Sequence, residues 1–179
     1  ERIEIARQLE KLNVDAIELP EIANAKTDSL LVRTVSSFVK GSVLSVGAGM
    51  AEGSVALAAS ALSGAAHPRI RIELPVSPVG MEYICHKKPP KMLEWIKEAV
   101  AMAKASCPSV EFCAVDATRA EKDFLKDAIV AATEAGATSV AICDSAAEML
   151  PDDFAVFSQD ARTEQRLSHR KRKANKITK

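Results

Sequence analysis

The sequence of 179 residues is 47% hydrophobic and 27% charged, the composition of a globular chain large enough to bury a core as one domain. No apolar stretch approaches the roughly 20 residues that cross a bilayer, which excludes a helical membrane protein. The 24 basic and 24 acidic residues balance, although seven of the bases and none of the acids lie in residues 166–179. We interpret residues 161–179 as a basic, disordered tail, and nucleic-acid binding through it is a weaker alternative.

The cysteines and the first residues bear on where the protein works. Cys85, Cys107, Cys113 and Cys143 show no C-x-x-C spacing, and a chain of this size needs no disulfide to stabilise its core. We therefore expect reduced thiols and a cytoplasmic location. The chain begins at Glu1 with neither a starting Met nor an apolar signal region, and we interpret it as a fragment of a longer protein.

Helical and extended patterns alternate along the chain. Apolar residues at helical spacing predict a first helix over 1–12, with Asn13 at a left-handed C-cap position. Five further helices are expected over 28–39, 52–62, 91–106 and 120–135 and from Pro151 onward. Between them lie five predicted strands, rich in Val and Ile, at 14–19, 42–46, 69–74, 110–115 and 138–143.

The regular spacing of these strands predicts an α/β fold. Three of the four intervals between strand starts are about 28 residues, the length of one strand with its crossover helix, and such alternation demands a parallel sheet. Two architectures satisfy the pattern: an open doubly wound sheet and a partial (β/α)8 TIM barrel. Periodicity does not choose between them, but in both a ligand binds at the carboxyl ends of the strands.

Residues that end the predicted strands are the candidates for a site. Glu18, Asp116 and Asp144 could serve as general bases or metal ligands, and capping or loop roles explain each about as well. The Gly-rich turn at 47–49 lacks a dinucleotide or Walker frame, so we interpret it as a tight turn rather than a phosphate cradle. With three histidines, none near a strand end, no self-contained zinc site or acyl-transfer triad can be assembled.

Several motifs, in order along residues 1–160, resemble those of one enzyme superfamily. The superfamily contains isopropylmalate synthase, homocitrate synthase and HMG-CoA lyase, and its shared unit is the HMGL-like, or pyruvate carboxyltransferase, domain. The similar segments are E-I-A-R-Q-L-E-K-L-N-V-D-A-I-E at 4–18, H-P-R-I-R at 67–71, S-P-V-G-M-E-Y at 77–83, V-E-F-C-A-V-D-A-T-R at 110–119, A-G-A-T at 135–138, D-S at 144–145 and P-D-D-F at 151–154. The resemblance implies a partial TIM-barrel domain over residues 1–160.

The resemblance also implies a function. The synthases of this superfamily are divalent-metal acyltransferases, using Mg, Mn or Zn, that condense acetyl-CoA with a 2-oxo acid in amino-acid biosynthesis. It implies Glu18 as the catalytic residue. The implied substrate-binding residues are Arg71, Ser77, Cys113, Asp116 and Ser145.

Two elements of the family pattern are missing. The metal ligands of the family, an Asp of an Arg-Asp pair on the first barrel strand and a His-x-His pair on the seventh, are not in this sequence. The resemblance therefore implies that this chain alone is inactive, and that a metal binds only in a complete parent protein, expected to be a homo-oligomer.

Within the matched region, several positions depart from the pattern. Gly49, Arg71 and Val115 stand where the family has Arg, His and Glu, and Ala147 replaces a Gly. Replacement of Glu by Val removes a charge and a hydrogen-bond acceptor from the implied substrate pocket. A second hypothesis is therefore a non-catalytic, divergent relative that binds a small acid or a partner protein.

Overall fold

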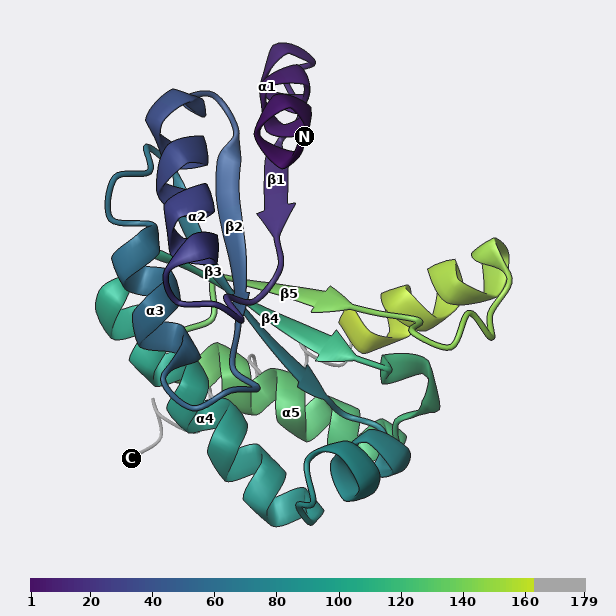
Figure 1. The fold of residues 1–179 in the computed structure, drawn as a ribbon. Coiled ribbons are helices and arrows are strands. Elements are labelled where there is room, and N and C mark those ends of the chain that lie inside the picture. Colours follow the sequence, from purple (N-terminus) through teal and green to yellow (C-terminus); the bar gives the residue numbers. More distant parts are fainter. Residues whose placement is uncertain (163–179) are drawn as a thin grey trace, which may run out of the picture.

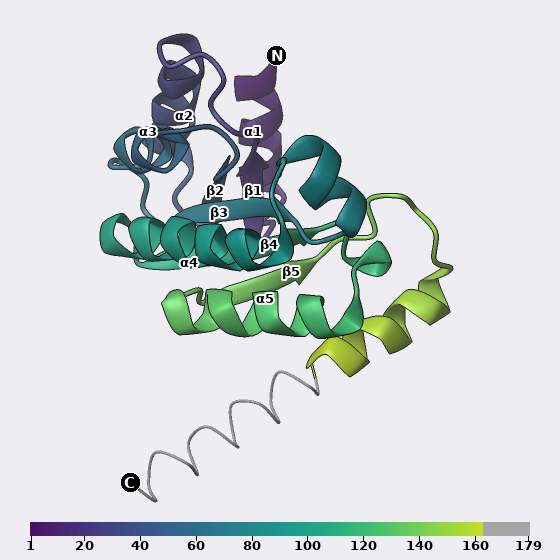
Figure 2. The ribbon, with the colours of Figure 1, turned by 90° about the horizontal axis from the view of Figure 1, so that it is seen from below.

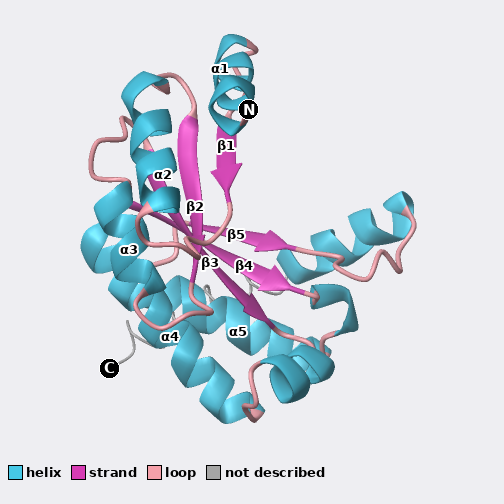
Figure 3. Cartoon of the chain, in the orientation of Figure 1, coloured by secondary structure: helices cyan, strands magenta, loops and turns pink. Residues whose placement is uncertain are grey.

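The computed structural model describes residues 1–162 and has a five-stranded parallel sheet (Figures 1 and 3). The strands, neighbours in chain order, are β1 (Ala16–Leu19), β2 (Val43–Ala48), β3 (Pro68–Pro75), β4 (Ser109–Val115) and β5 (Ser139–Ile142). The helices between them are α1 (Arg2–Lys11), α2 (Thr27–Phe38), α3 (Ser54–Ala61), α4 (Pro89–Ser106) and α5 (Lys122–Ala135), and residues 151–162 are also helical. Short π and 3-10 turns cover Gly80–Ile84 and Ala117–Arg119.

The strand order chooses between the two predicted architectures. A doubly wound sheet reverses its strand order and carries helices on both faces, whereas five sequential parallel strands joined by crossovers of one hand place their helices on one face. Figures 1 and 2 show α2, α3, α4 and α5 following one another around the outside of the curved sheet. The described residues therefore form five consecutive units of a partial (β/α)8 barrel, with every predicted element present and each bound within two residues of its expected position.

Side chains alternate between the two faces of the sheet, and the faces differ sharply in polarity. The outward side chains pack under the helices and are at most 1% exposed: Leu44, Val46, Ile70, Ile72, Leu74, Val110, Phe112 and Ala114. The alternate residues of β3 and β4, on the inner face, include charged groups, and Arg69 pairs there with Glu111 at 3.4 Å. The inner face is therefore a polar concave surface on a backbone held rigid by the outer core.

Local signals end the helices where the sequence predicted. Asn13 has φ 54°, and Gly136, which follows α5, has φ 114°. Both are left-handed conformations, which Asn and Gly adopt more readily than other residues. Pro89 and Pro90 occupy the first positions of α4, where a missing backbone N–H is tolerated.

The predicted turn at 47–49 begins later than expected. Gly47 and Ala48 continue β2, because they pair with Arg71 and Ile72 of β3. The chain turns only at Gly49, whose φ is 120°. The extension matters for the site because it places Gly47 on the sheet, beside Arg71.

The predicted end of the barrel domain and the predicted tail both lie close to residue 162, the last residue that the structure describes. The helix of residues 151–162 runs across the predicted domain end at 160. The remainder of the predicted basic tail, residues 163–179, lies outside the described residues. Within residues 1–162 no helix is both long and apolar enough to span a bilayer.

Candidate functional site

An arginine held between two carboxylates occupies the carboxyl end of the inner face. Arg71, on β3, pairs through Nη1 with Glu18 of β1 and through Nη2 with Glu73, two residues further along its own strand. The side chain of Arg71 is 17% exposed and that of Glu18 is 49% exposed. Burial opposes the charged guanidinium, but its two carboxylate partners outweigh that effect and raise the pKa of Arg71.

This contact crosses a whole strand, since β2 lies between β1 and β3. Gly47 is the residue of β2 beside Arg71. A Cβ at Gly47 would lie 3.3 Å from the carboxylate of Glu73 and 3.0 Å from the backbone nitrogen of Glu21. The absence of a side chain at this position therefore lets the guanidinium and its carboxylates lie against the sheet.

Two buried polar atoms near this cluster have no hydrogen-bond partner among the described residues. They are the hydroxyl of Ser45, which is next to Glu18 in the strand register, and Nε of Arg71. Buried polar groups in folded proteins are nearly always paired. An unpaired hydroxyl and an unpaired N–H at one end of the inner face therefore mark the place where a polar ligand would be bound.

A pair of thiols lies further around the same face. Cys113 of β4 and Cys143, the residue after β5, place their sulfur atoms 3.3 Å apart. The hydrogen bond with Cys113 lowers the pKa of Cys143 to about 7, burial opposes this shift, and Arg71 supports it. The same thiol contact and burial raise the pKa of Cys113. Either sulfur can donate in this contact, and Cys143, the less buried of the two, is the thiol that ionises first.

A second cluster joins the ends of β4 and β5. Asp116 has φ 60°, and its carboxylate accepts hydrogen bonds from Nε and Nη2 of Arg119 at 2.8 and 2.6 Å. Its backbone N–H donates to the hydroxyl of Ser145 at 2.9 Å. Arg119 lowers the pKa of Asp116, burial opposes this shift, and a hydrogen bond from Ser77 adds to the lowering. The carboxylate of Asp116 is therefore held ionised by three polar contacts.

The neighbouring polar groups hold loops in place. Ser77 is fully buried and its hydroxyl accepts a hydrogen bond from the N–H of Gly80 at 3.1 Å, which anchors the π turn. Thr118 donates to Asp144 at 2.8 Å, and Asp144 also accepts the N–H of Met149 at 2.9 Å. Asp144 therefore caps the loop that follows β5, as the capping interpretation expected.

The six predicted site residues fall into two groups. Glu18, Arg71 and Cys113 lie on the inner face of the sheet. Ser77, Asp116 and Ser145 form the network at the ends of β4 and β5. Ser45 and Glu73 stand among the strand-end residues of the sequence but were assigned no role, and Cys143 was not predicted. No local signal links Cys143 to Cys113.

The formal charge of these groups limits what they can bind unaided. Glu18 and Glu73 together outnumber Arg71, and Asp144 adds a further negative charge near the balanced pair of Asp116 and Arg119. Glu18 and Glu73 hold the Nη1 and Nη2 groups of Arg71, so its Nε–H is the donor left without a partner among the described residues. The carboxylate of Glu18 is half-exposed at the edge of this cluster and pairs with Arg71.

The metal that the resemblance implies does not fit this part of the chain. Among residues 1–162, no three His, Cys, Asp or Glu side chains gather so that they could hold a metal ion. We therefore assign no metal ligand to this chain and derive no step through a metal.

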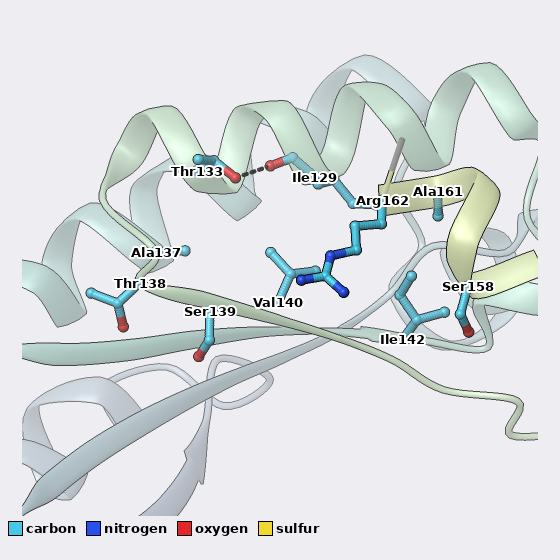
Figure 4. A pocket seen from close by; sticks show the side chains of 10 residues that line it. All are labelled: Ile129, Thr133, Ala137, Thr138, Ser139, Val140, Ile142, Ser158, Ala161 and Arg162. Carbon is cyan, nitrogen blue, oxygen red and sulfur yellow. Dashed lines mark hydrogen bonds between the residues drawn. The ribbon is translucent and has the colours of Figure 1, made fainter. Parts of the chain in front are cut away.

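A pocket of about 530 Å³ lies away from these clusters (Figure 4). It is formed by α5, β5 and the helix of residues 151–162, and Val140, Ile142 and Arg162 line it. Val140 and Ile142 alternate with the inner-face residues of β5, so the pocket lies on the outer side of the sheet. It is not part of the candidate site.

A family model and the curated relatives of the chain point to the same family. A family model described as HMGL-like matches residues 1–163. A 2-isopropylmalate synthase of Aquifex aeolicus (strain VF5) is 39% identical over 160 residues, which cover 89% of this chain and 31% of that protein. A 2-isopropylmalate synthase of Shouchella clausii (strain KSM-K16) is 36% identical over 154 residues, covering 86% of this chain and 30% of that protein. The chain thus spans about 30% of the length of these relatives.

Solved structures resemble the chain in fold. QR15, an aldolase, has a TM-score of 0.62 at 16% identity, covering 92% of this chain and 70% of the other. A phosphonopyruvate hydrolase, in complex with oxalate and Mg²⁺, has the same TM-score and identity, covering 87% of this chain and 59% of the other. At such low identity these likenesses bear on the fold alone.

Proposed function

Because the chain belongs to the HMGL-like family, we propose that it forms part of the barrel of an acyl-CoA:2-oxo acid condensing enzyme of the 2-isopropylmalate synthase kind. The observation that carries the proposal is the 39% identity with the Aquifex aeolicus synthase across 89% of the chain. The activity belongs to a complete barrel, of which these residues supply five units, and we expect the chain alone to be inactive. A divalent metal, acetyl-CoA as co-substrate, a homo-oligomeric parent and a cytoplasmic location are parts of the same proposal.

The geometry suggests a role for each predicted residue. Glu18 takes a proton from the methyl group of acetyl-CoA, and the carbanion so formed attacks the ketone carbon of the 2-oxo acid. Hydrolysis of the thioester then releases CoA. The substrate is held by Arg71, Ser77, Cys113, Asp116 and Ser145. The unpaired hydroxyl of Ser45 and Nε of Arg71 offer two further donors at the same end of the face.

A chimeric enzyme tests the proposal directly. Residues 1–160 replace the matching segment of the Aquifex aeolicus synthase, and free CoA is measured with acetyl-CoA and a panel of 2-oxo acids. The expected result is CoA release that depends on both substrates. A chimera that folds and yet releases no CoA with any 2-oxo acid would contradict the proposal.

A variant of the same chimera tests the role of Glu18. Glu18→Gln should lower turnover by about 100-fold or more, the contribution of a general base, and the half-exposed ion pair should contribute little to stability. Glu98→Gln, on the exposed side of α4, is the matched control and should leave turnover unchanged. A fall in the thermal midpoint without a change in turnover would make Glu18 a structural ion-pair partner.

Two observations favour the second hypothesis, a non-catalytic module that binds a small acid or a partner. Arg71 is already paired with two carboxylates, and Val115 offers no acidic group at the end of β4. In that case the isolated chain should bind a 2-oxo acid, or a partner protein, while the chimera stays inert. Titration calorimetry of the chain with the same panel of 2-oxo acids separates the two functions.

A further inference from the structure

The thiols of Cys113 and Cys143 are brought together by the sheet rather than by sequence. They are 30 residues apart. In the parallel register of β4 and β5, Cys113 pairs with Ala141, and Cys143 lies two residues further along the same face, diagonally beyond Cys113. The backbone N–H of Cys143 donates to the carbonyl of Ala114 at 3.1 Å, which fixes the two strand ends relative to each other. The sulfur atoms, 3.3 Å apart, are therefore held by backbone pairing on both sides.

We propose that Cys113 and Cys143 are a redox site that closes to a reversible disulfide on reaction with a low-molecular-weight disulfide. A disulfide bond is about 2.05 Å long, so the sulfur atoms need to approach by little more than about 1 Å. Closure requires rotation of both side chains toward each other.

The burial of the two thiols assigns their roles. Cys143 is partly exposed, whereas Cys113 is 5% exposed. The contact with Cys113 and the guanidinium of Arg71 favour the thiolate of Cys143, while burial, Glu73 and Glu18 oppose it. Cys143 is therefore the attacking thiol and Cys113 the resolving one.

The reaction balances in two exchange steps. The thiolate of Cys143 attacks one sulfur of the small disulfide, forms a mixed disulfide and releases one small thiol. Cys113 then loses its proton to solvent and attacks the sulfur of Cys143, which releases the second small thiol. The two protein thiols are oxidised, and one small disulfide is reduced to two thiols.

The proposal goes beyond the proposed condensation and does not depend on it. Its readout is the state of the sulfur atoms, which can be followed in a chain with no catalytic activity. An inactive chimeric synthase would not bear on the redox proposal. Likewise, the absence of a disulfide would not bear on the proposed condensation.

The redox proposal is tested by adding oxidised glutathione to the full chain at neutral pH. After alkylation of free thiols, trypsin cuts at Lys104 and Arg119, so Cys107 and Cys113 share one peptide. Mass spectrometry of the unreduced peptides, with fragmentation, then shows which of these two cysteines is cross-linked. The expected product is a cross-linked pair of peptides containing Cys113 and Cys143, lost on reduction. Cys107 should not enter this cross-link, because its buried thiol is held by the carbonyls of Pro68 and Ser109.

Single substitutions separate the two exchange steps. In Cys113→Ser, which keeps a hydroxyl donor beside Cys143, the reaction should stop at a stable glutathione adduct on Cys143. In Cys143→Ser, the buried Cys113 should react at least about tenfold more slowly than the pair. Circular dichroism confirms that each variant is folded.

Two results would overturn the proposal. One is a folded wild-type chain whose Cys113 and Cys143 both remain alkylatable after exposure to oxidised glutathione. The other is a wild-type chain that carries the same stable Cys143 adduct as Cys113→Ser, which would mean that the second exchange step does not occur.

Discussion

Gly47 is the residue that allows an arginine on β3 to reach a carboxylate on β1. Arg71 lies beside it on β3, and Glu18 lies on the other side of β2. Any side chain at 47 would press on Glu73 and on the backbone at Glu21. The ion-paired cluster therefore depends on a glycine that sequence alone presents as part of a turn. Close approach of groups, rather than backbone conformation, explains this glycine, since its φ is not in the left-handed region.

Gly47→Ala should destabilise the chain by about 1–3 kcal/mol, the usual effect of overpacking where neighbours cannot move away. The Cβ would lie 3.0 Å from a backbone nitrogen. Gly64→Ala is the matched control: a Cβ there meets nothing within 4 Å, and stability should be unchanged or slightly higher. Urea unfolding of both variants checks the prediction. Equal stability of the two variants would contradict it.

Val115 is the substitution that most directly concerns chemistry. It is half-buried at the end of β4, where the resembled family has Glu. In the chimeric synthase, Val115→Glu should raise turnover or change the preferred 2-oxo acid, because it returns an acidic group to the pocket. Steady-state rates across the panel measure this. Loss of folding in place of a kinetic change would identify position 115 as part of a packed apolar wall.

At the scale of elements, the carboxylate of Glu10 ties α1 to the start of β2. It accepts hydrogen bonds from the N–H groups of Lys40 and Gly41, both at 2.7 Å, and a longer one from Ser42. These contacts lower the pKa of Glu10 to about 2. Because the unfolded chain has an ordinary pKa of about 4.3, stability from this contact is complete above that value and is lost as pH falls toward 2.

Glu10→Gln should therefore be less stable than the wild type at neutral pH, and the difference should shrink as the pH falls from about 4.3 toward 2. Urea midpoints of the two proteins across this range provide the measurement. Asp116 and Asp144, whose pKa values are also lowered, are present in both proteins and cancel from the comparison. If the difference in stability between the two proteins did not change with pH, the contact would not depend on the charge of Glu10, and the prediction would be wrong.

Strand β4 carries the centre of the outer core. Phe112 is fully buried between the sheet and the helices, so Phe112→Ala should lower the free energy of unfolding by about 3–5 kcal/mol. Tyr83→Ala, at a side chain that is 70% exposed, is the control and should change it by less than about 0.5 kcal/mol. Urea unfolding measures both variants. A small effect at Phe112 would show that the core refills the cavity.

At the scale of the whole molecule, the described residues form an arc with two ends. Strands β2, β3 and β4 each pair on both sides, whereas β1 pairs only with β2 and β5 only with β4 within residues 1–162. Unpaired edges open more readily because fewer hydrogen bonds and contacts hold them. The ends of the arc should therefore be the least stable parts of the sheet.

Hydrogen exchange should show the amides of β3 and β4 as the most protected and those of β1 and β5 as the least. Mass spectrometry of the exchanging chain at several concentrations measures this order. Equal protection across all five strands would contradict it and would mean that another surface covers the edges. Protection of β1 and β5 that increases with concentration would identify that surface as a second copy of the chain.

The sequence by itself determined the elements and the fold class. Periodicity placed the helices and strands, and Asn13 and Gly136 marked helix ends, because such signals act over a few neighbouring residues. Helix α4 was expected from Lys91 and begins two residues earlier, at Pro89. The resemblance added the barrel and the family, and the match over residues 1–163 agrees with both. Strand-end positions such as Glu18 and Arg71 were also readable, since parallel strands end at one edge of a sheet.

Only the tertiary structure decided which of those residues meet. The order of the strands, which agrees with the barrel that the resemblance implied, depends on pairings between distant segments. The contact of Arg71 with Glu18 crosses a strand, and the approach of Cys113 to Cys143 joins residues 30 positions apart. Local propensity carries no information on such contacts, because side chains from different strands become neighbours only when the sheet forms and curves.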